Sequence, residues 1–145
     1  MRKEERDTGK AGPGPSIFVD SSGWIAFFSR RDQHHAEADR LLRSAIVSNK
    51  RLITSDLILA EVHRLLLFRA GSSAAIAALQ RIDSSGLVRI EFANDKIHRS
   101  AMEFLKRHIG HRITYADAVS FSIMDAAGCG KAITFDANFR LAGYL

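Results

Sequence analysis

Residues 16–24, with the sequence SIFVDSSGW, join a short apolar run to an acidic residue. The run Ser16 to Val19 has the length and composition of a buried β-strand. Asp20 follows directly, and two serines and a glycine come after it. A carboxylate at the end of a buried strand is costly unless its charge is compensated. Taken alone, Asp20 fits a turn with the serines as well as it fits a functional site.

The same arrangement recurs near the end of the sequence, in AITFDANF at residues 132–139. Asp136 follows the apolar run Ile133 to Phe135, which also has the composition of a strand. An ordinary loop containing Asp136 and Asn138 remains the alternative interpretation. Two predicted strands are therefore each followed directly by an aspartate.

Between these stretches, short apolar runs alternate with helical patterns. This alternation predicts βαβ units, and hence an α/β fold with a mainly parallel sheet and helices on both faces. Helices are expected to begin at Ser72, Asn94 and Thr114 as N-caps and to stop at Gly71 and Gly128. Strands are expected at 16–19, 51–55, 87–91 and 131–135, helices at 23–30 (or a turn), 32–49, 56–71, 72–86, 94–108 and 114–128, and a fifth strand or simply the chain end at 141–145.

Two further acids, Glu61 and Asp117, occur on the apolar faces of predicted helices. A carboxylate on such a face costs several kcal/mol unless it is paired or coordinated. Glu61 has an alternative as the ion-pair partner of Arg64 or Arg112. Asp117 has an alternative as the acidic arm of a capping box, because it stands three residues after Thr114. Each acid by itself is therefore ambiguous.

The four acids together favour a functional site. Ligands of open α/β sheets bind outside the carboxyl ends of the strands, where Asp20 and Asp136 are expected. Two carboxylates about 4 Å apart repel by roughly 4 kcal/mol at an effective dielectric constant of 20. A cluster of them is tolerated when some are protonated or a divalent cation lies among them. Carboxylate oxygens with open water positions favour Mg²⁺ or Mn²⁺.

Four segments resemble the acidic motifs of PIN domains, most closely those of the VapC-type ribonuclease toxins. They are IFVDSSGWIAFF (17–28), ILAEVHRLL (58–66), ITYADAVSFSIM (113–124) and AITFDANF (132–139). The resemblance extends over residues 16–145 and implies one PIN-like nuclease domain, a three-layer α/β/α sandwich with a central, mainly parallel sheet. It also implies metal-dependent hydrolysis of RNA phosphodiester bonds, an antitoxin partner and a homodimer.

By matching these motifs, the resemblance assigns roles to individual residues. Asp20, Glu61, Asp117 and Asp136 correspond to the catalytic acids that bind one or two Mg²⁺ or Mn²⁺ ions. Ser22 and Thr134 correspond to polar residues that support the site. Asn138 departs from the pattern, because many relatives have a basic residue or a histidine there.

Composition limits the remaining function classes. The net charge is +5 with a sequence pI of about 9.8, which fits an RNA substrate but also fits a merely basic protein. The single Cys129 excludes an intramolecular disulfide and a multi-cysteine metal site. No apolar run approaches the ~20 residues that span a bilayer, and no signal peptide is recognisable, so a cytoplasmic protein without a membrane partner is expected. Residues 1–15 are charged and then rich in Gly and Pro, which predicts a disordered tail.

Several alternatives remain open from the sequence. A structure-specific nuclease or RNA-processing factor would use the same acids on another substrate, and a non-catalytic RNA or protein interaction module would keep the fold alone. A phosphoacceptor signalling domain is disfavoured, because the third predicted strand ends in Glu91 rather than an aspartate. His34 and His35 are expected at a solvated helix start rather than in a metal site.

Overall fold

The computed structural model describes residues 14–143 as one four-stranded parallel sheet with helices on both faces. The strands are β1 (Gly14–Val19), β2 (Lys50–Ser55), β3 (Val88–Glu91) and β4 (Lys131–Ile133). The helices are α2 (Ser21–Phe28), α3 (His35–Val47), α4 (Asp56–Ala70), α5 (Ser72–Ser84), α6 (Asp95–Arg107), α7 (Tyr115–Ala127) and α8 (Ala137–Leu141).

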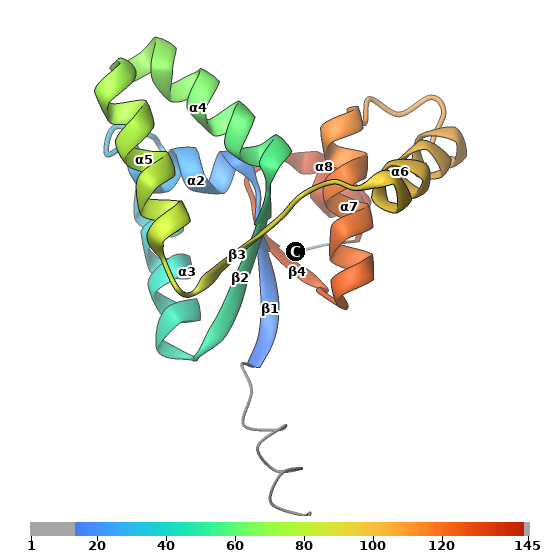
Figure 1. Cartoon of the computed structure of the whole chain (residues 1–145), viewed down its shortest axis with the longest axis horizontal. Helices are drawn as coiled ribbons and strands as arrows, with labels where there is room; N and C mark the ends of the chain where they lie inside the picture. The colour runs from blue at the N-terminus through green and yellow to red at the C-terminus, as the bar shows by residue number, and fades with distance from the viewer. Residues whose placement is uncertain (1–13, 144–145) are drawn as a thin grey trace, which may run out of the picture.

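The sheet has the strand order β3-β2-β1-β4, and every pair is parallel. Helices α2 to α5 lie on one side of it and α6 to α8 on the other (Figure 1). The predicted α/β sandwich is therefore confirmed. Since β1 and β4 are neighbours, with Val19 in register with Ile133, the residues that follow them emerge at the same edge.

The core is built on the apolar strands β1 and β2, where the side chains of Phe18, Val19 and Ile53 are fully buried. The polar groups of Trp24 and Thr54 in this layer are hydrogen-bonded: Trp24 Nε1–H donates to Thr54 Oγ1 (3.1 Å), and the Thr54 hydroxyl donates to the Val19 carbonyl (3.0 Å). Buried polar groups are tolerated when they are hydrogen-bonded in this way. The contacts fix the end of β1 against β2 and the first turns of α2.

Several predicted boundaries differ from the structure. Strand β1 begins at Gly14, two residues before the predicted start. The N-cap of α5 is Gly71 rather than Ser72, because the same residue ends α4 with a φ of +94°, a conformation that favours glycine. At 141–145 the fifth-strand alternative is wrong for the described part, because Leu141 ends helix α8.

Strand β4 is shorter than predicted and ends at Ile133. The backbone N–H of Phe135 donates to Ser22 Oγ (2.8 Å), so the chain leaves the sheet at this point. The side chain of Asp136 then accepts from the N–H of Asn138 (2.9 Å) and caps α8, which the sequence analysis did not anticipate. The predicted tail lies, for residues 1–13, outside the described residues. No helix between residues 14 and 143 combines the length and apolar character needed to cross a membrane.

Gly23, in the first turn of α2, lies against β4. A Cβ atom at this position would be 2.6 Å from the carbonyl oxygen of Ile133. That carbonyl cannot shift freely, because it accepts the backbone N–H of Asp20 (3.1 Å). We expect Gly23→Ala to lower the free energy of unfolding by about 1–3 kcal/mol, as overpacking does elsewhere. Urea denaturation measures it, with Gly86→Ala as the control because open space surrounds Gly86. Equal stability of the two variants would contradict this close packing.

Candidate active site

Three of the predicted acids gather at the carboxyl edge of the sheet. Asp20 follows β1 and is the N-cap of α2, and Asp136 follows β4 and is the N-cap of α8. Asp117 lies in the first turn of α7. Asp20 and Asp117 are buried, with 4% and 8% of their surface exposed, and Asp136 is half-buried. Neighbouring strand ends and one helix start thus supply the three carboxylates.

Two hydroxyl groups hold the Asp20 side chain. Ser22 Oγ donates to Asp20 Oδ2 (3.2 Å), and Thr134 Oγ1 donates to the same oxygen (3.0 Å). The two hydroxyl oxygens are themselves 3.3 Å apart. Each also accepts a backbone N–H, Ser22 from Phe135 and Thr134 from Asp136 (3.0 Å). The residues expected to support the site therefore connect the Asp20 carboxylate to the loop that follows β4.

Asp117 forms the capping box that the sequence offered as one interpretation, and its role as a metal ligand stays a prediction. Its side chain forms a capping box with Thr114: Asp117 N–H donates to Thr114 Oγ1 (3.0 Å), and Thr114 N–H donates to Asp117 Oδ2 (3.3 Å). Asn138 Nδ2 donates to that same Oδ2 (3.0 Å) and to the carbonyl of Arg112 (2.9 Å). Asn138 thereby connects α8 to the start of α7 and orients the carboxylate.

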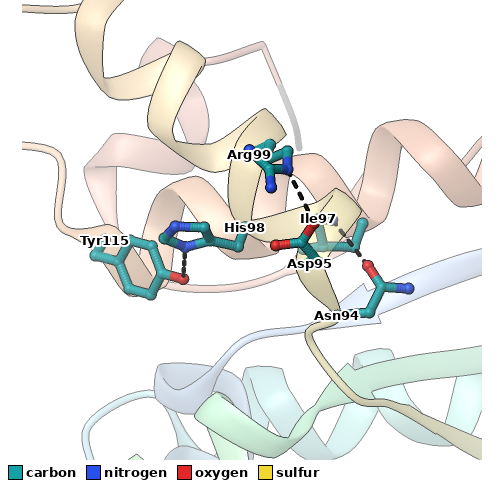
Figure 2. Close-up of polar contacts among 6 residues, drawn as sticks. All are labelled: Asn94, Asp95, Ile97, His98, Arg99 and Tyr115. Atoms are coloured by element: carbon teal, nitrogen blue, oxygen red, sulfur yellow. Dashed lines mark hydrogen bonds and ion pairs between the residues drawn. The ribbon is translucent and has the colours of Figure 1, made fainter.

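The start of α7 is also held from the side of α6. His98 Nδ1 and the Tyr115 hydroxyl are 2.8 Å apart and hydrogen-bonded, and their rings make an edge contact (Figure 2). At the same end of α6, Asn94 caps the helix through the N–H of Ile97 (2.8 Å), as predicted. These contacts fix the first turn of α7, from which Asp117 projects.

The carboxylates of the site influence one another electrostatically. The pKa of Asp20 is raised from 3.8 to about 6: burial is the largest cause and the charges of Asp117 and Asp136 add to it, while the hydrogen bonds from the Ser21 backbone and Thr134 oppose it. Burial also raises the pKa of Asp117, helped by the charge of Asp136 and opposed by the hydrogen bond from Asn138. Removing water and adding like charges both disfavour the ionised form. The three carboxylates are therefore unfavourable when all are ionised without a nearby positive charge.

The carboxylate oxygens of these acids are ligands of the kind that a hard divalent cation prefers. Within residues 14–143, the hydrogen bonds to Asp20 and Asp117 come from hydroxyl, amide and backbone groups, and no Lys or Arg forms a salt bridge with either acid. Oxygen ligands of this kind suit Mg²⁺ or Mn²⁺. In the same range no three His, Cys, Asp or Glu side chains are close enough to enclose an ion. Binding therefore requires the carboxylates to turn toward a common point.

Comparison with known proteins decides the family. The PIN domain family matches residues 17–143 of this chain, the range that contains all four acidic segments. The chain belongs to the PIN domain family. Within that family it is a VapC-type endoribonuclease by sequence and by fold, as the relatives below show.

Two curated VapC proteins are similar to this PIN domain over most of its length. The 23S rRNA-specific endonuclease VapC20 of Mycobacterium tuberculosis is 36% identical over 129 residues, which is 89% of this chain and 95% of that protein. The VapC ribonuclease of Archaeoglobus fulgidus is 26% identical over 128 residues, 87% of this chain and 80% of that protein. These matches place the whole PIN domain, and not one motif alone, among the VapC proteins.

Two solved structures share the fold of this PIN domain. The crystal structure of VapC20, described as a Sarcin-Ricin loop cleaving toxin, superposes with a TM-score of 0.81 and 36% identity, covering 89% of this chain and 96% of that one. The structure of VapBC2 from Rickettsia felis, bound to a DNA fragment from its promoter, has a TM-score of 0.64 and 16% identity, covering 90% and 96%. At that identity the second match supports the fold alone.

Glu61, the fourth predicted acid of the PIN site, lies in the second turn of α4 and is half-buried. It is not among the principal causes of the raised pKa of Asp20 or of Asp117. Within the described residues it forms no salt bridge with Arg64 or Arg112, the alternative considered from the sequence. Its role as a ligand stays a prediction.

Two features beside the PIN site were not predicted from the sequence. Asn138, a departure from the family pattern and part of the loop alternative, donates a hydrogen bond to Asp117. His34, expected at a solvated helix start, is half-buried and stacks on Phe135 with ring centroids 4.3 Å apart and an interplanar angle of 5°. The contact between Asn138 and Asp117 spans more than twenty residues of sequence, and the contact between His34 and Phe135 spans about a hundred. No local sequence pattern predicts contacts between segments so far apart.

Proposed function

We propose that this VapC-type endoribonuclease hydrolyses RNA with Mg²⁺ or Mn²⁺ held by Asp20, Asp117 and Asp136, with Glu61 completing the site directly or through water. The observation that supports the site most strongly is the gathering of three carboxylates, none of which forms a salt bridge with a Lys or Arg within residues 14–143. Such a group of like charges is unfavourable by itself and favourable around a cation.

The residues around the acids have distinct tasks in this proposal. Ser22 and Thr134 donate hydrogen bonds to the carboxylate of Asp20, and Asn138 donates one to that of Asp117, so both acids have polar partners that stabilise the ionised form. Asp136 is half-buried and open toward the surface, where a phosphodiester approaches. A divalent cation held by these acids would lower the pKa of a bound water and stabilise the charge that develops on the phosphoryl oxygens. Attack of water on phosphorus, with the P–O3′ bond breaking and the 3′-oxygen taking up a proton, would leave a 5′-phosphate and a 3′-hydroxyl.

The substrate proposed from the comparisons is ribosomal RNA. VapC20 is described as a 23S rRNA-specific endonuclease that cleaves the Sarcin-Ricin loop, and it is 36% identical to this chain. We extend the same class of substrate to this protein, and we place its action in the cytoplasm, where ribosomes are found. The test is incubation of 23S rRNA and of unrelated structured RNAs with the protein, with Mg²⁺ or Mn²⁺ and with EDTA. Cleavage that persists in EDTA, or no cleavage of any RNA, would contradict the proposal.

We also propose a homodimer and an antitoxin as protein partners. Large apolar side chains are exposed on several elements, among them Phe68 (78%) on α4 and Ile76 (50%) on α5. Exposed apolar surface of this kind marks protein interfaces. Light scattering checks the dimer directly. A strict monomer at high concentration, together with no co-purifying protein when the chain is expressed with its neighbouring gene, would argue against both partners.

RNA affinity is expected to fall steeply with salt. Four arginines line one groove beside α2, α4 and α5, namely Arg30, Arg31, Arg69 and Arg81. Each phosphate contact releases counterions, so the plot of log affinity against log salt falls by about 0.9 per contact on duplex and about 0.7 on single strands. Binding of labelled RNA in EDTA between about 50 and 200 mM salt measures the slope. Arg69→Gln is expected to reduce the slope by about one contact, whereas a flat dependence in the parent would exclude electrostatics as the main holding force.

A further inference from the structure

A pocket beside the acids has the chemistry of a nucleotide-binding site. It has a volume of about 300 Å³ and is lined by His34, Thr134, Phe135, Asp136, Ala137 and Arg140. We call these six residues the stacking pocket. Two of them, Thr134 and Asp136, also belong to the acid site, through the hydrogen bond to Asp20 and the charge that raises its pKa. A ligand in the stacking pocket therefore lies next to the carboxylates.

The stacking pocket contains a preformed aromatic surface. The rings of His34 and Phe135 are almost parallel and in contact, and both line the pocket. The backbone of each residue is fixed by a hydrogen bond: the N–H of His34 donates to Asp32 Oδ1 (2.8 Å), and the N–H of Phe135 donates to Ser22 Oγ (2.8 Å). A flat surface that is already in place is what a nucleobase stacks on, and any base has a suitable face.

The stacking pocket also contains a cation. Arg140 is exposed and lies one helical turn after Asp136, yet within residues 14–143 no acidic side chain forms a salt bridge with it. A guanidinium without an acidic partner suits a phosphate group. Ring surface and guanidinium together match the base and the phosphate of one nucleotide, whereas an apolar protein side chain would use only the rings.

We propose that the stacking pocket binds one unpaired nucleotide of the RNA substrate, next to the phosphodiester that is cleaved. The base stacks on the His34–Phe135 pair, and Arg140 contacts a phosphate. This proposal rests on the proposed nuclease function and adds a requirement to it: the RNA must present an unstacked nucleotide at the cleavage site. Sequence-tolerant stacking would then hold the chain while the adjacent phosphate lies against the acids.

The experiment compares two oligomers of equal length in EDTA, where no cleavage occurs: a fluorescent oligoadenylate hexamer and an abasic ribose-phosphate hexamer. Fluorescence anisotropy gives the affinity for each. The parent protein is expected to bind oligoadenylate at least about fivefold more tightly than the abasic oligomer, which is the smallest gain in affinity expected from one stacked base. Phe135→Leu is expected to remove most of this preference without changing the affinity for the abasic oligomer. Arg140→Gln is expected to weaken binding of both oligomers by the same factor.

Matched controls and a second variant keep the test decisive. Phe92→Leu removes an exposed ring (69% exposed) that follows β3, the outer strand on the far side of the sheet from β4. Arg99→Gln removes an exposed guanidinium that pairs with Asp95. Neither change is expected to alter the base preference. If Phe135→Leu melts far below the parent, His34→Gln replaces it and is expected to reduce the preference in the same way.

Equal affinity of the parent for the two oligomers would overturn the stacking pocket, and it is also the result expected if the pocket takes a protein side chain. A folded Phe135→Leu variant that keeps the full preference would overturn it as well. Cleavage of RNA by a protein without base preference would leave the nuclease function intact and remove only this inference. Base preference in a protein that cleaves no RNA would support the stacking pocket and remove the proposed function.

Discussion

Asp117→Asn is expected to reduce RNA cleavage at least about a hundredfold while the fold survives. Even partners that only orient metal ligands cost about 10–100-fold when they are replaced, so the loss of a ligand costs at least as much. The fold is expected to survive because the hydrogen bonds from Thr114 N–H and Asn138 Nδ2 both end on Oδ2 of Asp117. One amide oxygen can accept both. The change also removes a negative charge from a repelling group, so stability without metal should be equal or higher.

Cleavage of 23S rRNA and thermal melting, each with and without Mn²⁺, measure the effect of Asp117→Asn. Asp83→Asn is the matched control, since it removes the same charge from an exposed position on α5. Mn²⁺ is expected to raise the melting temperature of the parent and of Asp83→Asn more than that of Asp117→Asn. If Asp117 is only a capping residue, the variant cuts RNA at the parental rate and loses about 1 kcal/mol of stability. That result would remove Asp117 from the catalytic site.

The stability of the metal-free protein is expected to fall as the pH rises from about 4 to above 6. Burial raises the pKa of Asp20 from 3.8 to about 6, so in this window the folded protein holds a proton that the unfolded chain has released. Unfolding then releases that proton, and the free energy of unfolding decreases with rising pH. A shift of this size corresponds to about 3 kcal/mol, present below pH 4 and lost above the folded-state pKa. The raised pKa of Asp117 acts in the same direction.

Asp20→Asn removes the ionisation and should abolish most of this pH dependence. The hydroxyls of Ser22 and Thr134 both donate to Oδ2 of Asp20, so one amide oxygen can again accept both. At pH 8 without metal the variant is expected to melt up to about 10 °C above the parent. Thermal melts in EDTA from pH 4 to pH 8 measure this. A parent that is equally stable across the range, or a variant that melts lower at pH 8, would contradict the buried, uncompensated charge.

The sequence was enough to predict where the acids lie because their signals are local. An apolar run followed by an aspartate placed Asp20 and Asp136 after strands, and the structure has both there. The capping signals at Asn94 and Thr114 are equally local, and both caps are confirmed by hydrogen bonds. Patterns of this kind depend on a few consecutive residues, and these can be read without knowing the tertiary structure.

The parts that the sequence could not predict depend on contacts between distant segments. Strand β4 ends early because Ser22 takes the N–H of Phe135, 113 residues away. Helix α8 was missed because its five residues are too short for a periodic pattern, and its N-cap Asp136 was interpreted as a site residue or as part of an ordinary loop. For Asp117, the capping and site interpretations were treated as alternatives. In the structure this carboxylate accepts the capping hydrogen bond from Thr114, and its charge also raises the pKa of Asp20.

The most direct measurement of the central claim is an anomalous-difference map from crystals soaked in Mn²⁺. We predict a peak at the carboxyl edge of the sheet, within about 2.0–2.4 Å of oxygens from Asp20, Asp117 and Asp136, after these side chains have turned toward one another. Crystals of Asp117→Asn should show a weaker peak or none. A parent crystal with no peak at these three residues, in a protein that still cleaves RNA, would show that the acids at the strand ends are not the metal site.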